Sequence, residues 1–189
     1  MLAGNAVFFL DGYTKAIKVS SKGYPNLSVS ESTREKVLRG SKEGFTDAVK
    51  TNSALVRKRI RDTRLKVKQK ILGERSQTVV QILYIEDLVR PGLVEEIEKR
   101  LDSFVIDGVL DSGILEQMTE SSWMSPFPQF QTTERPDKCA AEILNGRILV
   151  LTDHSPVGLL LPAVFNDFLQ VSEDYYNRFA IVSLQRLLR

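Results

Sequence analysis

Charged side chains of both signs stand close together at two places in the sequence, each near the start of a predicted helix. Arg39 and Glu43 mark the first place, and Glu134 and Arg135 form the second. A zwitterionic ligand needs a cation for its carboxylate and an anion for its amine, so these four side chains are candidate ligand contacts. Each also has a structural alternative as a helix cap or an ion-pair partner. The sequence leaves both interpretations open.

Two further residues complete the candidate set. Asp137 lies in the predicted first turn of the second helix, where the helix dipole favours a carboxylate. Either Asp137 or Glu134 could receive a contact from Arg39 across the junction, directly or through a bound ligand. Asn52 falls near the apolar side of a predicted helix, where a buried amide needs hydrogen-bond partners. Its side chain would either tie down a neighbouring loop or face a cleft.

The stretch Gly40–Gly44 raises the question of a phosphate loop. That pattern needs four residues between its glycines, then Lys and Ser or Thr, directly after a buried strand. Here three residues separate the glycines and Phe45 follows the second one. We therefore expect a rigid glycine turn that begins a helix and places Arg39 and Glu43 at a junction between subdomains.

The residue types of the chain give little support for a metal site or a catalytic site. The chain has one cysteine, Cys139, and one histidine, His154, so a metal cluster of thiolates and imidazoles cannot form within it. No nucleophile, base and orienting group can be named together. The sequence predicts a non-enzyme with no catalytic residue, no metal site and no cofactor, and Cys139 as a small buried hydrophobe.

Charge is distributed unevenly along the chain. Residues 34–75 hold 14 Lys or Arg against 5 Asp or Glu, whereas the remainder holds 12 against 19. The basic part could contact nucleic acid, an anionic membrane or an acidic partner, or it could be a solvated surface paired with the acidic remainder. We expect no specific nucleic-acid binding, and only weak, salt-sensitive binding to polyanions.

Hydrophobic periodicity predicts the elements that position these residues. Strands are expected at 5–10 and 14–19 as a hairpin, at 65–72, 78–86 and 104–110, and in a second hairpin within 146–162; helices are expected at 45–61, after Pro91, at 113–119 and after Thr133. No stretch approaches the roughly 18 apolar residues of a membrane span, and the start does not have the pattern of a signal peptide.

The two predicted hairpins suggest how the chain divides. In each, a glycine precedes an aspartate by seven residues, at Gly4 and Asp11 and again at Gly146 and Asp153. We expect an α/β fold of two small mixed α/β subdomains, each with one hairpin, at residues 1–88 and 89–172. The first subdomain would lack an upstream element. Residues 173–189 form an apolar C-terminal helix in this prediction, and they would lead toward a membrane region outside the chain.

Several motifs together resemble one known family, the A subunit of spore germinant receptors. They are RGSKEGF at 39–45, TN at 51–52, LVRKRIRD at 55–62 and FPQ…TERPD at 127–137. The register holds from Gly4 to about Tyr176. The family usually has proline and arginine where this chain has Ser41 and Lys42, and isoleucine where it has Val56.

The resemblance implies a fold, a location and partners. Proteins of this family are integral to the spore inner membrane, act with B and C subunits, could be oligomeric, and trigger germination when nutrients such as amino acids or sugars are present. Their soluble part is thought to have two α/β subdomains separated by a cleft. The single cysteine and the basic segment favour the core-facing, cytoplasmic side. Two hypotheses follow: a module that senses a nutrient or relays its signal, or an assembly module without a ligand site.

Overall fold

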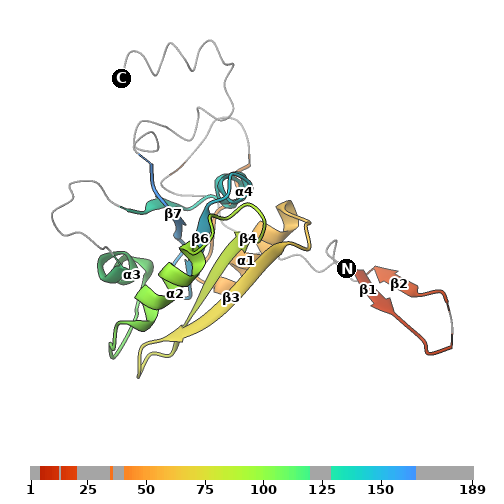
Figure 1. Cartoon of the computed structure of the whole chain (residues 1–189), viewed down its shortest axis with the longest axis horizontal. Helices are drawn as coiled ribbons and strands as arrows, with labels where there is room; N and C mark the ends of the chain where they lie inside the picture. Colours follow the sequence, from red (N-terminus) through yellow and green to blue (C-terminus); the bar gives the residue numbers. More distant parts are fainter. Residues whose placement is uncertain (1–4, 13, 21–34, 36–40, 120–128, 165–189) are drawn as a thin grey trace, which may run out of the picture.

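A five-stranded antiparallel sheet is the centre of the protein. The computed structural model describes residues 5–12, 14–20, 35, 41–119 and 129–164 (Figure 1). The sheet has the strand order β3-β4-β6-β7-β5. The strands are β3 (Leu65–Leu72), β4 (Thr78–Ile85), β5 (Gln131–Thr133), β6 (Ile148–Thr152) and β7 (Gly158–Leu161).

Helices cover both faces of this sheet (Figure 1). Successive side chains of a strand point to opposite faces, so a strand buried on both sides reads as a continuous apolar run. In β4, Leu83 and Ile85 pack with α1 (Val49–Arg59) and α4 (Pro136–Leu144). Ile82 and Tyr84 pack on the other face with α2 (Leu93–Asp102) and α3 (Ser112–Thr119). The chain therefore has the mixed α/β architecture that the sequence predicts.

The sheet does not divide at the boundary expected between residues 88 and 89. β4 lies before that boundary and β6 after it, yet the two strands pair directly, with Val80 opposite Thr152 and Leu83 opposite Leu149. Strands of both expected subdomains therefore share one sheet. The prediction failed here because a local pattern identifies a strand but does not identify its partner. The cleft expected between two subdomains is not confirmed by the described residues.

The strand predicted at 104–110 is wrong. This segment is irregular, and its carbonyl groups accept hydrogen bonds from the turn between β3 and β4. The Glu74 N–H donates to the Ile106 carbonyl at 2.9 Å, and the Arg75 N–H donates to the Asp107 carbonyl at 2.8 Å. The segment is thus held against a turn, and Val105 stays 85% exposed.

The start of α1 is fixed by a turn that lies far away in the sequence. The Val49 N–H donates to Asp153 Oδ1 at 3.0 Å, and the His154 N–H donates to the Asp47 carbonyl at 2.8 Å. Asp153 and His154 belong to the turn of the β6–β7 hairpin, so Asp153 supplies the carboxylate cap that α1 lacks in its own sequence. The segment before α1 is therefore anchored to the sheet.

The first hairpin forms as predicted and has a sheet of its own. Its strands, β1 (Asn5–Phe8) and β2 (Ile17–Ser20), pair antiparallel, and Gly12 in the turn has a φ of 84°. Large apolar side chains on it are exposed, among them Phe8, Phe9 and Ile17. In the part of the chain that the structure describes, no helix is long and apolar enough to cross a membrane. The helix predicted at 173–189 lies outside the described residues.

Candidate functional site

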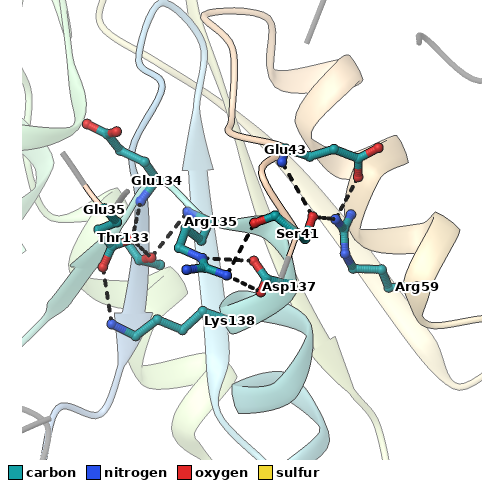
Figure 2. Close-up of polar contacts among 9 residues, drawn as sticks. All are labelled: Glu35, Ser41, Glu43, Arg59, Thr133, Glu134, Arg135, Asp137 and Lys138. Atoms are coloured by element: carbon teal, nitrogen blue, oxygen red, sulfur yellow. Dashed lines mark hydrogen bonds and ion pairs between the residues drawn. The ribbon is translucent and has the colours of Figure 1, made fainter. Parts of the chain in front are cut away.

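Most of the predicted candidate residues meet in one network of polar contacts, shown in part in Figure 2. We call this network the polar clamp. It joins residue 35 and the segment 41–45 to the end of β5, the start of α4 and the last turn of α1. Its members are Glu35, Ser41, Glu43, Lys58, Arg59, Thr133, Glu134, Arg135, Asp137 and Lys138.

Arg135 is the most deeply buried charge of the polar clamp. Its side chain is 2% exposed and its Nη2 lies 2.6 Å from Asp137 Oδ2. Its Nε donates to the other carboxylate oxygen at 3.1 Å, which makes the pair bidentate, the strong geometry for arginine and a carboxylate. Nη2 also donates to the Ser41 carbonyl at 3.4 Å. Arg135 therefore connects the first turn of α4 to the segment before α1.

Glu35 forms a second connection to α4. Its carboxylate accepts hydrogen bonds from the Thr133 hydroxyl and, at 3.2 Å, from the Glu134 N–H. Lys138 Nζ lies 3.4 Å from its other oxygen, and the Lys138 side chain is only 8% exposed. Thr133 is the last residue of β5, while Arg135 takes the N-cap position of α4. Glu35 thus holds the β5–α4 corner through three groups.

Glu43 forms the third connection, to the last turn of α1. Its two carboxylate oxygens lie 2.8 Å from Lys58 Nζ and 2.6 Å from Arg59 Nη2. The hydrogen bond from Lys58 lowers the pKa of Glu43 most, partial burial opposes it, and Arg59 lowers the pKa further. Ser41 joins this connection to the Arg135 pair, because its hydroxyl accepts from Arg59 at 3.0 Å.

The lowered pKa of Glu43 predicts a pH effect on stability. Because the folded pKa lies below the ordinary value of 4.5, the stabilisation is complete above that pH and is lost as pH falls through the folded pKa. The side chain is 34% exposed, so the expected contribution is below about 1 kcal/mol. Denaturant unfolding at pH 7 should show Glu43→Gln to be less stable than the native chain, with a smaller difference at pH 4.

The matched control for this prediction is Glu74→Gln, which removes an exposed carboxylate from the β3–β4 turn. The stability of Glu74→Gln relative to the native chain should be the same at pH 7 as at pH 4. If Glu43→Gln differed from the native chain by the same amount at pH 7 and at pH 4, the ionised pair would not contribute to stability.

The other predicted residues lie in three different settings. Asn52 is fully buried, and both atoms of its amide bond Thr46: Oδ1 accepts the Thr46 N–H at 2.8 Å and Nδ2 donates to the Thr46 carbonyl at 2.6 Å. It ties down the segment before α1, which is one of the two predicted roles. Glu134 contributes backbone groups, since its carbonyl accepts the Phe45 N–H at 2.8 Å, and its carboxylate points away from Arg135 in Figure 2. Arg39 lies outside the described residues.

The turn expected at Gly40–Gly44 is not what the described part of that stretch forms. Residues 41–44 contain no turn, and Glu43 is in a β-bridge. The hydrogen bonds from Phe45 to the Glu134 carbonyl and from Arg135 to the Ser41 carbonyl hold this segment alongside the start of α4. Tertiary contacts therefore decide its conformation, and Phe45 is buried in the core at 3% exposure.

Glu35, Lys58, Arg59 and Lys138 were not among the predicted candidates. Lys138 directly follows the quoted TERPD motif, so extending that motif by one residue would have included it. Glu35 carries no local signal, because its partner Thr133 is 98 residues away in the sequence. Lys58 and Arg59 lie in the last turn of α1, within the basic stretch 34–75 for which the sequence leaves several kinds of partner open.

Neither a metal site nor a reactive thiol is found in the described parts of the chain. Among residues 5–12, 14–20, 35, 41–119 and 129–164, no group of three His, Cys, Asp or Glu side chains is placed to hold a metal ion. Cys139 is buried, and burial raises the pKa of its thiol well above the ordinary value.

A small apolar hollow is lined by Leu101, Leu115, Phe130 and neighbouring residues. It lies between α2, α3 and the sheet, on the face opposite α1 and α4.

Comparisons with known proteins agree on one family. Residues 1–189 match the family described as Bacillus/Clostridium GerA spore germination protein. The chain is 41% identical to the uncharacterized membrane protein YfkQ of Bacillus subtilis and 39% identical to spore germination protein GerLA of Bacillus cereus. Each match covers 100% of this chain, with 37% of the first relative and 38% of the second. The chain thus spans less than two fifths of the length of these curated relatives.

A solved structure is also similar to this chain. It is the N-terminal domain of the A subunit of the Bacillus megaterium spore germinant receptor GerK3. The TM-score is 0.62 at 34% sequence identity, and the match covers 87% of this chain and 58% of that one. Fold and sequence therefore point to the same relatives.

Proposed function

The chain belongs to the GerA family of spore germination proteins, and from this membership we propose that it relays a nutrient signal through the polar clamp within a germinant receptor. The chain is an A-subunit-like domain involved in spore germination. The relay is the more specific part of the proposal, because it concerns what the clamp residues do when the receptor changes state.

One observation carries the proposal: the charges of the polar clamp pair with one another. Arg135 pairs with Asp137, Lys138 with Glu35, and Glu43 with both Lys58 and Arg59. A nutrient carboxylate could take the bidentate contact with Arg135 only by displacing Asp137, which would leave the displaced carboxylate without its guanidinium. Because Asp137 already occupies the bidentate contact of Arg135, the clamp supports relay over direct sensing at this place.

The connections of the clamp suggest how the relay works. Residue 35 and the segment 41–45 are bound to the start of α4 by Arg135 and Glu35, and to the end of α1 by Glu43. Moving this part of the chain would break several charge-assisted contacts together, so the clamp favours two discrete arrangements over a continuous range. The contacts that are made in one arrangement and not in the other would carry the signal.

Assembly is the second candidate function, and the β1–β2 hairpin favours it. Phe8 is 57% exposed, Phe9 77% and Ile17 55%. A two-stranded hairpin with exposed apolar side chains is marginally stable alone and gains from a covering surface. In this alternative the domain holds receptor subunits together and has no ligand site of its own.

The partners and location follow from the same membership as proposals. We propose that the full-length protein acts with B and C subunits in the spore inner membrane, with this domain on the core side. The names of the relatives given above describe germination or membrane proteins and no enzyme. The uneven charge of residues 34–75 is consistent with the core side.

An NMR titration separates relay from direct sensing. The isotope-labelled chain is titrated with amino acids and sugars one at a time, and amide shifts are followed for clamp residues such as Ser41 and Lys138. Relay predicts no saturable shift at the clamp with any of these nutrients. Saturable shifts at these amides that disappear in Arg135→Lys would replace relay with sensing, because lysine keeps the charge but cannot form the bidentate contact.

A further inference from the structure

One side of α1 carries a row of cations that the polar clamp does not use. We infer that this row, Lys50, Arg57 and Arg61, is a docking surface for anionic lipid headgroups. The helix rises about 1.5 Å per residue and turns about 100° per residue. Positions 50 and 57 therefore lie on the same side of the helix, two turns and roughly 10 Å apart along its axis. Arg61 lies just beyond the helix, after the extended C-cap residue Ile60, and its Nε donates to the Lys58 carbonyl at 3.3 Å, which holds its side chain against the last turn. We call these three cations the stripe.

These cations differ from their neighbours in having no carboxylate partner. Lys58 and Arg59 pair with Glu43, and Arg64 pairs with Asp62 and Asp87. In the described ranges no ion pair involves the three stripe residues, and all three are exposed. The charge of the stripe is therefore uncompensated by the nearby carboxylates, while the adjacent charges are paired.

The opposite side of α1 holds the stripe in a fixed orientation. Val49 is 2% exposed, Leu55 1% and Val56 0%, and all three pack against the sheet and α4. The Asp153 carboxylate caps the start of the helix at Val49. The helix therefore holds Lys50 and Arg57 outward on one side, with the exposed Arg61 just beyond its end.

Exposed cations on one side of a fixed helix suit a planar anionic surface. Cations near an anionic bilayer each add to the attraction, and the effect decays within a Debye length. Single-stranded nucleic acid would need aromatic stacking side chains beside the charges, and the sequence of α1, VKTNSALVRKR, contains none. YfkQ, a membrane protein, contains a segment similar to this whole chain, which brings such a domain within reach of lipid headgroups.

Vesicle sedimentation tests the inference with the full chain. The vesicles contain either phosphatidylcholine alone or phosphatidylcholine with about one third phosphatidylglycerol, at low and at physiological salt. We expect binding to the phosphatidylglycerol vesicles only, and weaker binding at higher salt. The triple variant Lys50→Gln, Arg57→Gln, Arg61→Gln should bind at least about tenfold more weakly, because each cation contributes to the attraction.

The matched control removes three exposed cations elsewhere, Lys15, Lys18 and Arg90, by the same change to glutamine. It has the same net charge as the triple variant and should bind within about twofold of the native chain if the row itself docks. The inference would be overturned if both triple variants lost vesicle binding equally, or if the chain bound neutral vesicles as well as anionic ones. It would also be overturned if the chain bound RNA but not vesicles. Circular dichroism checks folding, and Arg57→Gln alone, expected to weaken binding severalfold, tests the stripe if the triple variant unfolds.

Discussion

Replacing Arg135 with methionine is expected to lower the free energy of unfolding by about 3 kcal/mol, because it removes one partner of a buried ion pair. The Arg135 side chain is 2% exposed and that of Asp137 18%, with 2.6 Å between Nη2 and Oδ2. Methionine fills similar space but leaves the carboxylate without its guanidinium. It also removes the hydrogen bond to the Ser41 carbonyl. Denaturant unfolding followed by circular dichroism measures the change.

Two companion variants make this result interpretable. Arg64→Met removes an arginine that is 56% exposed and paired with Asp62 and Asp87, and it should change stability much less than Arg135→Met does, because solvent screens exposed ion pairs. Adding Asp137→Asn to Arg135→Met should recover part of the loss, since the stranded charge disappears. Equal effects of Arg135→Met and Arg64→Met would show that burial does not make this pair special.

Gly146→Ala is expected to be comparably damaging, at about 3 kcal/mol, for a steric reason. Gly146 has a φ of 88° and ends α4 with the two hydrogen bonds of a Schellman motif, from the Gly146 N–H to the Ile143 carbonyl and from the Arg147 N–H to the Glu142 carbonyl. A Cβ at this position would lie 2.5 Å from the Leu88 carbonyl oxygen. Left-handed strain of about 1 kcal/mol and the collision with backbone add together.

Two other glycines separate these two costs. Gly92 has a φ of 84° with nothing within 4 Å of the added Cβ, so Gly92→Ala should show the strain alone, about 1 kcal/mol. At Gly108 the nearest atom to the added Cβ is Ser76 Cβ at 3.5 Å, an ordinary contact, and Gly108→Ala should be nearly neutral. Thermal or denaturant unfolding of the three variants gives the comparison. If Gly146→Ala lost no more than Gly92→Ala, the contact with Leu88 would not restrain the end of α4.

Local patterns in the sequence predicted those parts of the fold that depend on nearby residues. The apolar spacing around Val49, Leu55 and Val56 placed α1, and the run VVQILYI placed β4 within one residue of its observed end. The strand predicted at 104–110 failed because its carbonyls bind the β3–β4 turn, a partner that periodicity does not reveal. The boundary at residue 88 failed for the same reason, since β4 finds β6 across more than 60 residues.

The candidate site was also predicted only in part, where neighbouring residues gave a local signal. Glu134, Arg135 and Asp137 stood out because opposite charges were adjacent at a helix start, and the structure brings them together with Glu43. Glu35 could not be found, because nothing near it in the sequence indicates a contact with Thr133, 98 residues away. Asn52 was identified as a buried amide from its position on the apolar side of a helix, but only the structure supplied its partner, Thr46.

The central claim is that the polar clamp relays the signal, and germination of spores carrying Glu35→Gln in the full-length protein tests it most directly. Glutamine keeps the shape of Glu35 and can accept a hydrogen bond from Thr133, but it removes the charge opposite Lys138, a side chain 8% exposed. The control is Glu74→Gln, an exposed carboxylate on the β3–β4 turn. At equal amounts of receptor in the spore membrane, we predict severalfold slower nutrient-triggered germination for Glu35→Gln and an unchanged rate for Glu74→Gln. Germination of Glu35→Gln spores at the native rate, with receptor amounts equal, would contradict the relay.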